Sequence, residues 1–152
     1  MYIIFAISFT FSFSIVGLFA NLAIKDKSFY RHLENFNFIK SDTVNRYLGI
    51  VYFKEILLRS FWRQLNPTIK ITKHPDRQKL ISLRNEMTSA EIGHLIAFIC
   101  VIIVAVIFKI KHFYEGAFIP ILISNIIFHT YPVLLQQYNK RRLDKVIDRF
   151  KS

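Results

Sequence analysis

Glu91 and His94 lie three residues apart at the charged start of an otherwise apolar run. On an α-helix this spacing places two side chains next to each other on one face. An imidazole can take a proton from a hydroxyl group, and a neighbouring carboxylate can orient the ring and stabilise its charged form. Ionisable side chains at the edge of a membrane segment are costly to bury and often functional. The pair therefore predicts general-base catalysis, with His94 as the base and Glu91 as its partner.

A second set of polar side chains interrupts a later apolar run. Asn125, His129, Pro132 and Gln136 recur at helical spacing and would form one stripe on a helix. If this helix packs antiparallel to the helix of Glu91, we expect the two stripes to meet in the cytoplasmic leaflet and form a polar pocket, with Asn125 lying deepest. The mouth of this pocket would be lined by Tyr138, Asn139, Arg141 and Arg142.

Three interpretations of these polar residues compete. The first is catalysis by His94 and Glu91. The second is a metal site, because Glu-x-x-His is the helical motif of di-iron carboxylate proteins. That site needs two such motifs and further carboxylates; the chain has one motif, so we expect no metal. The third is a non-enzymatic membrane protein for lipid binding or scaffolding, whose stripes supply interhelical hydrogen bonds worth about 1 kcal/mol or less each.

Several common catalytic motifs are absent from the sequence. It has no G-x-S-x-G elbow, no P-loop and no glycine-rich dinucleotide motif. No histidine is followed by the His-x-x-x-x-Asp pattern of soluble-type acyltransferases. These absences argue against a hydrolase triad, a nucleoside-triphosphate enzyme and a bound redox cofactor.

The elements that must position these residues are membrane helices. The chain is 53% hydrophobic and 16% aromatic, and its apolar runs at about 2–24, 90–109 and 116–138 are long enough to span a bilayer. The first run could instead be a cleaved signal peptide. It lacks a basic n-region, however, and its apolar core exceeds the usual h-region length, which favours a retained span.

The basic residues predict the orientation of these spans. Residues 25–90 contain thirteen Lys and Arg against six Asp and Glu, and residues 139–152 contain six against two. By the positive-inside rule both segments lie in the cytoplasm, and the N-terminus lies outside the cell membrane. Because the basic residues flank membrane segments, we expect membrane lipids or a phosphorylated ligand as partners and no nucleic acid.

Two amphipathic segments complete the expected all-α fold, a single membrane domain over residues 1–152. Residues 47–66 predict a cytoplasmic interfacial helix that ends near Asn66 and Pro67, with apolar and charged residues on opposite sides. Residues 139–150 predict a basic C-terminal surface helix. The residues before the second span predict one helix continuous with it.

Small residues next to the Glu91 face predict close helix packing. Ala90, Gly93 and Ala97 form a strip that would let another helix approach closely. Together with the small buried core expected of so short a chain, this strip favours a homo-oligomer.

Two blocks of sequence resemble the glycosyl-diaponeurosporenoate acyltransferase family of staphyloxanthin-type carotenoid biosynthesis. They are "EMTSAEIGHL", before the second span, and "YPVLLQQYNKRRL", at the end of the third. The stretch "FWRQLNP" is also similar. The resemblance is best over residues 84–143, and its points are Glu86, Ala90, Glu91, His94, Pro132, Gln136, Tyr138, Asn139, Arg142 and Leu143. His129 is a departure, since an asparagine is expected just before the Tyr-Pro pair.

The resemblance implies transfer of a fatty acyl group to a sugar hydroxyl of a lipid-like glycoside at the membrane. On these positions His94 would be the base, Glu91 its partner and Glu86 a supporting acid, while Asn139 and Arg142 would help bind donor or acceptor. An acyl-CoA donor would arrive from the cytoplasm, and its phosphates could meet basic side chains there. The candidates are Arg59, Arg63, Arg84, Arg141 and Arg142.

Overall fold

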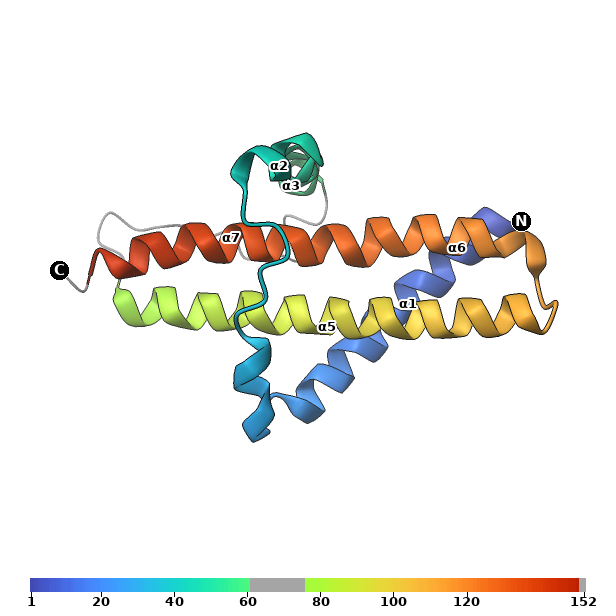
Figure 1. The fold of residues 1–152 in the computed structure, drawn as a ribbon, viewed down its shortest axis with the longest axis horizontal. Coiled ribbons are helices and arrows are strands. Elements are labelled where there is room, and N and C mark those ends of the chain that lie inside the picture. The colour runs from blue at the N-terminus through green and yellow to red at the C-terminus, as the bar shows by residue number, and fades with distance from the viewer. Residues whose placement is uncertain (61–75, 151–152) are drawn as a thin grey trace. The chain divides into compact units, whose positions relative to one another are not determined.

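The computed structural model describes residues 1–60 and 76–150, which are helical throughout apart from short connections (Figure 1). In chain order the elements are α1 (Tyr2–Ile24), the 3₁₀ helix η1 (Ser28–Leu33), α2 (Asp42–Tyr47), α3 (Ile50–Arg59), α5 (Arg77–Ile110), the 3₁₀ turn η2 (Glu115–Ala117), α6 (Phe118–Asn125), the π-helical turn η3 (Ile126–Thr130) and α7 (Tyr131–Asp148). No strand occurs in the described part of the chain, and the all-α prediction is confirmed.

Three helical segments are long and apolar enough to cross a membrane. They are Tyr2–Ile24, Arg77–Ile110 and Glu115–Asp148, the last of which joins η2, α6, η3 and α7. Large apolar side chains remain exposed along all three, for example Ile3, Ile103 and Ile119, as expected of surfaces that face lipid. The protein is therefore a multi-pass membrane protein, while the orientation of its termini stays a prediction.

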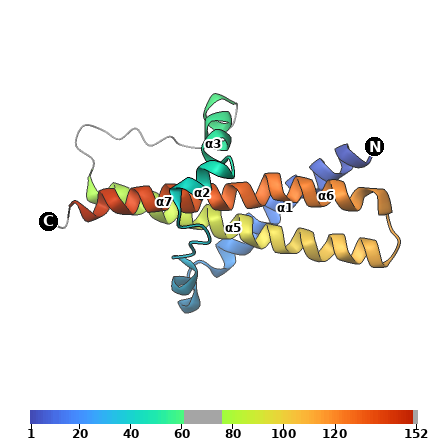
Figure 2. The ribbon, with the colours of Figure 1, turned by 45° about the horizontal axis from the view of Figure 1, so that its top comes forward.

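The second and third spans are parts of longer helices than their apolar runs. α5 begins at Arg77, so the charged stretch before the second span is continuous with it, as expected. At the other end, α6, η3 and α7 follow one another without a break (Figure 2). The basic C-terminal segment continues the third apolar helix as far as Asp148 and does not form a separate surface helix.

The predicted interfacial helix corresponds in part to α3. Gly49 adopts a left-handed conformation with φ of 74° and separates α2 from α3, which explains why the helix begins at Ile50 and not at residue 47. Residues 61–67 lie outside the described residues; they are the whole stretch "FWRQLNP" and include Arg63 and the predicted helix end near Asn66 and Pro67. The surface location of this helix stays a prediction.

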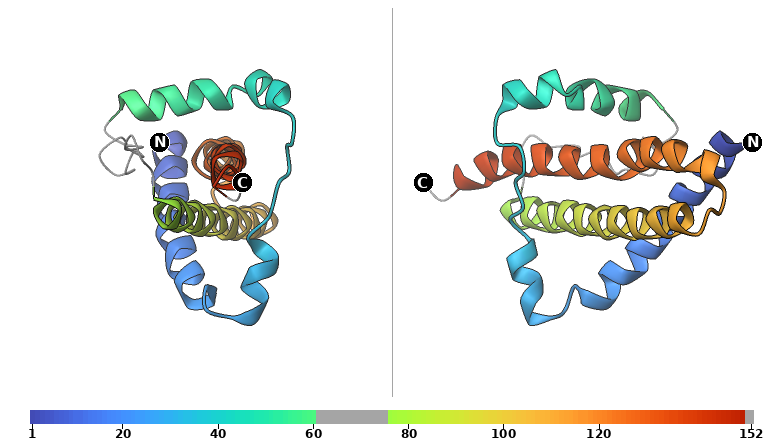
Figure 3. Two further views of the ribbon diagram at one scale, coloured as in Figure 1. Left: turned by 90° about the vertical axis from the view of Figure 1, so that its left-hand side faces the viewer. Right: turned by 45° about the vertical axis from the view of Figure 1, so that its right-hand side comes forward.

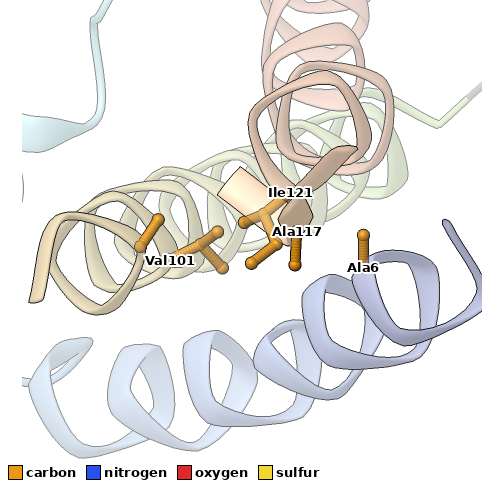
Figure 4. Packing of buried hydrophobic residues seen from close by; sticks show 5 residues of the cluster. Ala6, Val101, Ala117 and Ile121 are labelled. Atoms are coloured by element: carbon orange, nitrogen blue, oxygen red, sulfur yellow. The ribbon is translucent and has the colours of Figure 1, made fainter. Parts of the chain in front are cut away.

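The chain divides into two compact units. Unit 1 comprises Met1–Asn35 and Ser89–Val133. Within it, α1 packs against α6 and crosses α5 (Figure 1). Its buried apolar core, four of whose residues are labelled in Figure 4, is Ala6, Val101, Ala105, Ala117 and Ile121, surrounded by phenylalanines. Small side chains in this core let the helices approach closely.

Unit 2 comprises Phe36–Thr88 and Leu134–Ser152. Within it, the first turns of α5 lie beside the last turns of α7 (Figure 3). Leu80 of α5 packs against Leu143 and Ile147 of α7. Two of the apolar residues that the sequence assigned to a surface helix are therefore buried in a contact between helices.

Candidate functional site

Two histidines from different helices meet in unit 1. Nδ1 of His94 on α5 lies 3.3 Å from Nδ1 of His129 in η3, and the ring centroids are 5.6 Å apart. On its other side, Nε2 of His129 lies 3.1 Å from the backbone carbonyl oxygen of Thr10 on α1. His129 is fully buried and His94 half-buried. Three elements thus hold a chain of contacts that ends at the more exposed histidine.

The hydrogen bonds of this chain assign a proton to each ring. A neutral imidazole has one N–H donor and one acceptor nitrogen. Because the Thr10 carbonyl can only accept, Nε2 of His129 donates to it. With both rings neutral, Nδ1 of His129 is then an acceptor, so Nδ1 of His94 donates to it. Nε2 of His94 consequently keeps a lone pair, which is the form that a general base requires.

The role of α1 in this arrangement could not be found in the sequence. Thr10 belongs to a segment without charged residues, and its contribution is a backbone carbonyl, which every residue possesses. Its side chain is fully buried as well, and its hydroxyl oxygen has no hydrogen-bond partner among the described residues. No residue type marks a backbone acceptor, so only the packing of α1 reveals it.

Close packing of α1 on α5 brings the Thr10 carbonyl within hydrogen-bonding distance of His129. A methyl group built on Gly17 would lie 2.1 Å from the carbonyl oxygen of Gly93 and 2.9 Å from Cβ of Ala97. The small-residue strip on α5 therefore does allow a second helix to approach, and the helix that approaches is α1. Self-association stays a prediction.

Asn125 is fully buried in unit 1 and joins two helices. Its Nδ2 donates a hydrogen bond of 3.2 Å to the carbonyl oxygen of Phe98 on α5. Its Oδ1 has no hydrogen-bond partner among the described residues. The contact to a backbone carbonyl gives Asn125 a packing role; its predicted role in substrate binding stays a prediction.

Glu91 is fully buried, near a second set of polar residues. The Tyr30 hydroxyl donates to Oδ1 of Asn21 at 2.9 Å, and Nδ2 of Asn21 donates to the Ser89 hydroxyl at 2.6 Å. Burial raises the pKa of Tyr30, its hydrogen bonds act in the opposite direction, and the charges of Glu34 and Glu91 add smaller upward contributions. The charge of Glu91 thus makes a small contribution to the raised pKa of Tyr30. A direct contact of Glu91 with His94 stays a prediction.

In unit 2 the two neighbouring glutamines of the third span differ in burial. Gln137 is buried and accepts a hydrogen bond of 2.8 Å from the backbone N–H of Phe38, whereas Gln136 is only half-buried. A π turn inserts one extra residue into a helix, and η3 lies between Asn125 and Gln136. The shift accounts for the burial of Gln137 beside a half-buried Gln136, while the predicted role of Gln136 in substrate binding stays a prediction.

A proline supplies the physical reason for the π turn. Pro132 lacks a backbone N–H, and its ring would clash with the carbonyl group four residues earlier in an α-helix. That carbonyl belongs to Phe128, inside η3. The wider turn accommodates the ring without ending the helix.

The basic residues of unit 2 differ in how far they are engaged. Nη1 of Arg141 donates to Oδ1 of Asn37 at 2.8 Å, and its Nη2 lies 3.7 Å from Oδ1 of Asp42. The guanidinium carbons of Arg141 and Arg142 lie 5.8 and 5.7 Å from the centre of the Tyr138 ring, within the range of cation–π attraction. Arg142 is exposed, and of these two arginines it is the more accessible to a ligand.

Other residues predicted for the site lie on α5 and α7. Nε of Arg84 on α5 donates to Oδ1 of Asp144 on α7 at 2.5 Å, so this cation is paired within the protein. Glu86 is exposed, and Asn139 is half-buried.

On α3, burial lowers the pKa of Lys54, and the charge of Arg142 lowers it further. In the described ranges, no three His, Cys, Asp or Glu side chains are grouped as a metal site would require.

A comparison with known protein families finds one family that matches the chain. The family described as glycosyl-4,4'-diaponeurosporenoate acyltransferase matches residues 26–149, more than half of the chain. Among curated proteins and solved structures, no match was found. The match includes both blocks on which the resemblance was based, and it supports a general role in acyl transfer with an acyl donor and an acceptor as substrates. The chain therefore belongs to the glycosyl-4,4'-diaponeurosporenoate acyltransferase family.

Proposed function

We propose that the protein transfers a fatty acyl group to a hydroxyl group of a lipid-like, glycosylated acceptor, with His94 as the general base. The observation that carries this proposal is the chain of contacts from Thr10 through His129 to His94. These contacts leave Nε2 of a half-buried His94 with a lone pair, while Nδ1 of His94 and both ring nitrogens of His129 take part in hydrogen bonds. A carotenoid glycoside is the acceptor that the family's name suggests.

The proposed reaction has two proton transfers. The acceptor hydroxyl attacks the carbonyl carbon of an acyl thioester as its proton passes to Nε2 of His94. The tetrahedral intermediate then collapses, the C–S bond breaks, and His94 returns the proton to the departing thiolate. Glu91 would stabilise the charged imidazole between these transfers, and Glu86 would act as a supporting acid. General-base catalysis of this kind contributes roughly 10²- to 10⁴-fold to a rate.

The donor is proposed to be acyl-CoA, arriving from the cytoplasm. Among the predicted phosphate partners that the structure describes, we favour Arg142, because it is exposed and held beside Tyr138. Arg59 is exposed too, whereas Arg84 and Arg141 bond to acidic or amide side chains within the protein. Asn139 and Gln136 are proposed to contact donor or acceptor. The pocket that would join these residues stays a prediction.

The test is the replacement of His94 by alanine. In cells that express the protein, the profile of lipids and glycolipids should show an acylated product that is lost with His94→Ala, while the amount of protein in the membrane is unchanged. The matched control is His112→Ala, because His112 lies in an exposed connection and pairs with Glu115. An unchanged product level in His94→Ala would exclude His94 as the base.

A non-enzymatic role is the second candidate, and one observation favours it. Asn125 and His129 both bond to backbone carbonyls of neighbouring helices, as residues that only pack helices do. Under this alternative the His94→Gln variant should be tolerated, and no acylated lipid should depend on the protein. Lipid profiles with and without the protein separate the two candidates directly.

A further inference from the structure

We propose that His129 is a positioning residue, which fixes the proton of His94 on Nδ1 and is itself held by the Thr10 carbonyl. This inference rests on the proposed function, since it assigns how the base is kept in its active form. It gives His129 a role other than substrate binding, and it makes α1 a part of the site. Residues 1–25 precede the segment that matches the family.

The proposal begins with what the two tautomers of His94 would do. With the proton on Nδ1, Nε2 can accept the proton of a substrate hydroxyl. With the proton on Nε2, the same atom would donate a hydrogen bond and could not act as a base. Which tautomer forms is set by the hydrogen bond at the other nitrogen. For His94 that bond is the one of 3.3 Å to Nδ1 of His129.

The tautomer of His129 is fixed in turn by a group that cannot change its role. The Thr10 carbonyl belongs to the backbone of α1 and can only accept, so it keeps the proton of His129 on Nε2. His129 is fully buried, so its ring is not exposed to bulk water. A hydroxyl group in place of this carbonyl could either donate or accept, and it would leave the direction of these hydrogen bonds open. The carbonyl therefore fixes the direction of donation in both hydrogen bonds: His94 donates to His129, and His129 donates to the backbone of α1.

Two substitutions of His129 separate its two hydrogen bonds. The side-chain oxygen of asparagine is as many bonds from Cβ as Nδ1 of histidine, so His129→Asn keeps an acceptor for His94 and loses the donor to Thr10. The side-chain nitrogen of glutamine matches Nε2 in the same way, so His129→Gln keeps the donor to Thr10 and loses the acceptor for His94. His129→Leu loses both. A positioning role requires the asparagine variant to be the more active, and a purely structural link to α1 requires the glutamine variant to be.

The first experiment reads the tautomer itself. The full-length protein, with ¹⁵N-labelled histidine and reconstituted in lipid bilayers, is studied by NMR, in which protonated and unprotonated ring nitrogens have well-separated shifts. The His94 signals are assigned by their loss in His94→Ala. We expect Nδ1 of His94 to be protonated in the natural protein and in His129→Asn, and a mixture of tautomers in His129→Gln and His129→Leu. A proton on Nε2 of His94 in the natural protein would overturn the proposal without any variant.

The second experiment measures the acylated lipid in cells that produce each variant at equal membrane levels. We expect His129→Gln and His129→Leu to lose about tenfold or more of the acylated lipid, up to the roughly 10²- to 10⁴-fold that general-base catalysis contributes, and His129→Asn to retain clearly more than either. The reverse order would show that His129 only links helices. If the NMR result holds but His94→Ala still makes product, the tautomer assignment stands and the proposed base is wrong. The two failures are thereby distinguished.

Discussion

Gly17 of α1 lies directly against the backbone of Gly93 on α5. A methyl group on Gly17 would come within 2.1 Å of the Gly93 carbonyl oxygen, a distance that real contacts do not reach. The relationship is not symmetrical, because a methyl group on Gly93 would lie 3.5 Å from the nearest atom of Gly17. This crossing fixes α1 against the helix that carries His94, one residue beyond Gly93.

Gly17→Ala should therefore lower the free energy of unfolding by about 1–3 kcal/mol, the usual cost of overpacking. It should also lower acyl transfer, because a displaced α1 moves the Thr10 carbonyl. Thermal unfolding in detergent measures the first effect and lipid profiling the second. Gly93→Ala is the control: its added methyl group makes an ordinary contact, and alanine favours a helix over glycine by up to about 1 kcal/mol. Equal loss of stability in both variants would contradict the described crossing.

Gln137 should matter for stability and Gln136 should not. Gln137→Ala removes the acceptor of the Phe38 N–H, and an unsatisfied donor in a partly buried place costs about 1–3 kcal/mol. Gln136→Ala should change the free energy of unfolding by less than about 0.5 kcal/mol, although it can still affect substrate binding. Chemical or thermal unfolding of the two variants compares them. A larger loss in Gln136→Ala would mean that the π turn does not displace the buried face.

Tyr30 should stabilise the protein in a manner that depends on pH. Its hydroxyl is bonded to Asn21, so Tyr30→Phe should cost about 1 kcal/mol at neutral pH. Burial raises the pKa of Tyr30 above its ordinary value of 10.0. Its contribution is therefore fully present below pH 10 and is lost as the pH rises through the raised value, because the unfolded chain ionises first.

The measurement is the difference in unfolding free energy between the natural protein and Tyr30→Phe from neutral to alkaline pH. This difference should shrink on the alkaline side of pH 10. Tyr47→Phe serves as the control for the substitution, since Tyr47 is 93% exposed and its replacement should leave the free energy of unfolding at neutral pH almost unchanged. A difference that grows with alkalinity would contradict the direction of the pKa shift.

The sequence predicted the helical architecture well because hydrophobicity and length decide it. A run such as Tyr2–Ile24 can satisfy its backbone in a bilayer only as a helix, and the structure forms that helix over the same residues. The strip with Gly93 was likewise recognised from side-chain size alone. Its partner on α1 was not, because a single glycine among apolar residues, such as Gly17, does not identify its contact.

The sequence did not reveal which glutamine of the third span is buried. A constant α-helical period was assumed through Pro132, and the π turn before it shifts the following residues by one position. Gln137 is buried and Gln136 is half-buried for that reason. A backbone irregularity of one residue leaves hydropathy almost unchanged, so no periodicity in the sequence reveals it.

The sequence by itself determined that Glu91 and His94 share a helix face within a membrane protein, because helical spacing and apolar length need no knowledge of other segments. Only the tertiary structure decided that His94 meets His129 and that His129 meets the carbonyl of Thr10. These hydrogen bonds join residues 35 and 119 positions apart in the chain, and one of them involves no side chain on α1. Which nitrogen of His94 holds the proton therefore depends on how the helices pack.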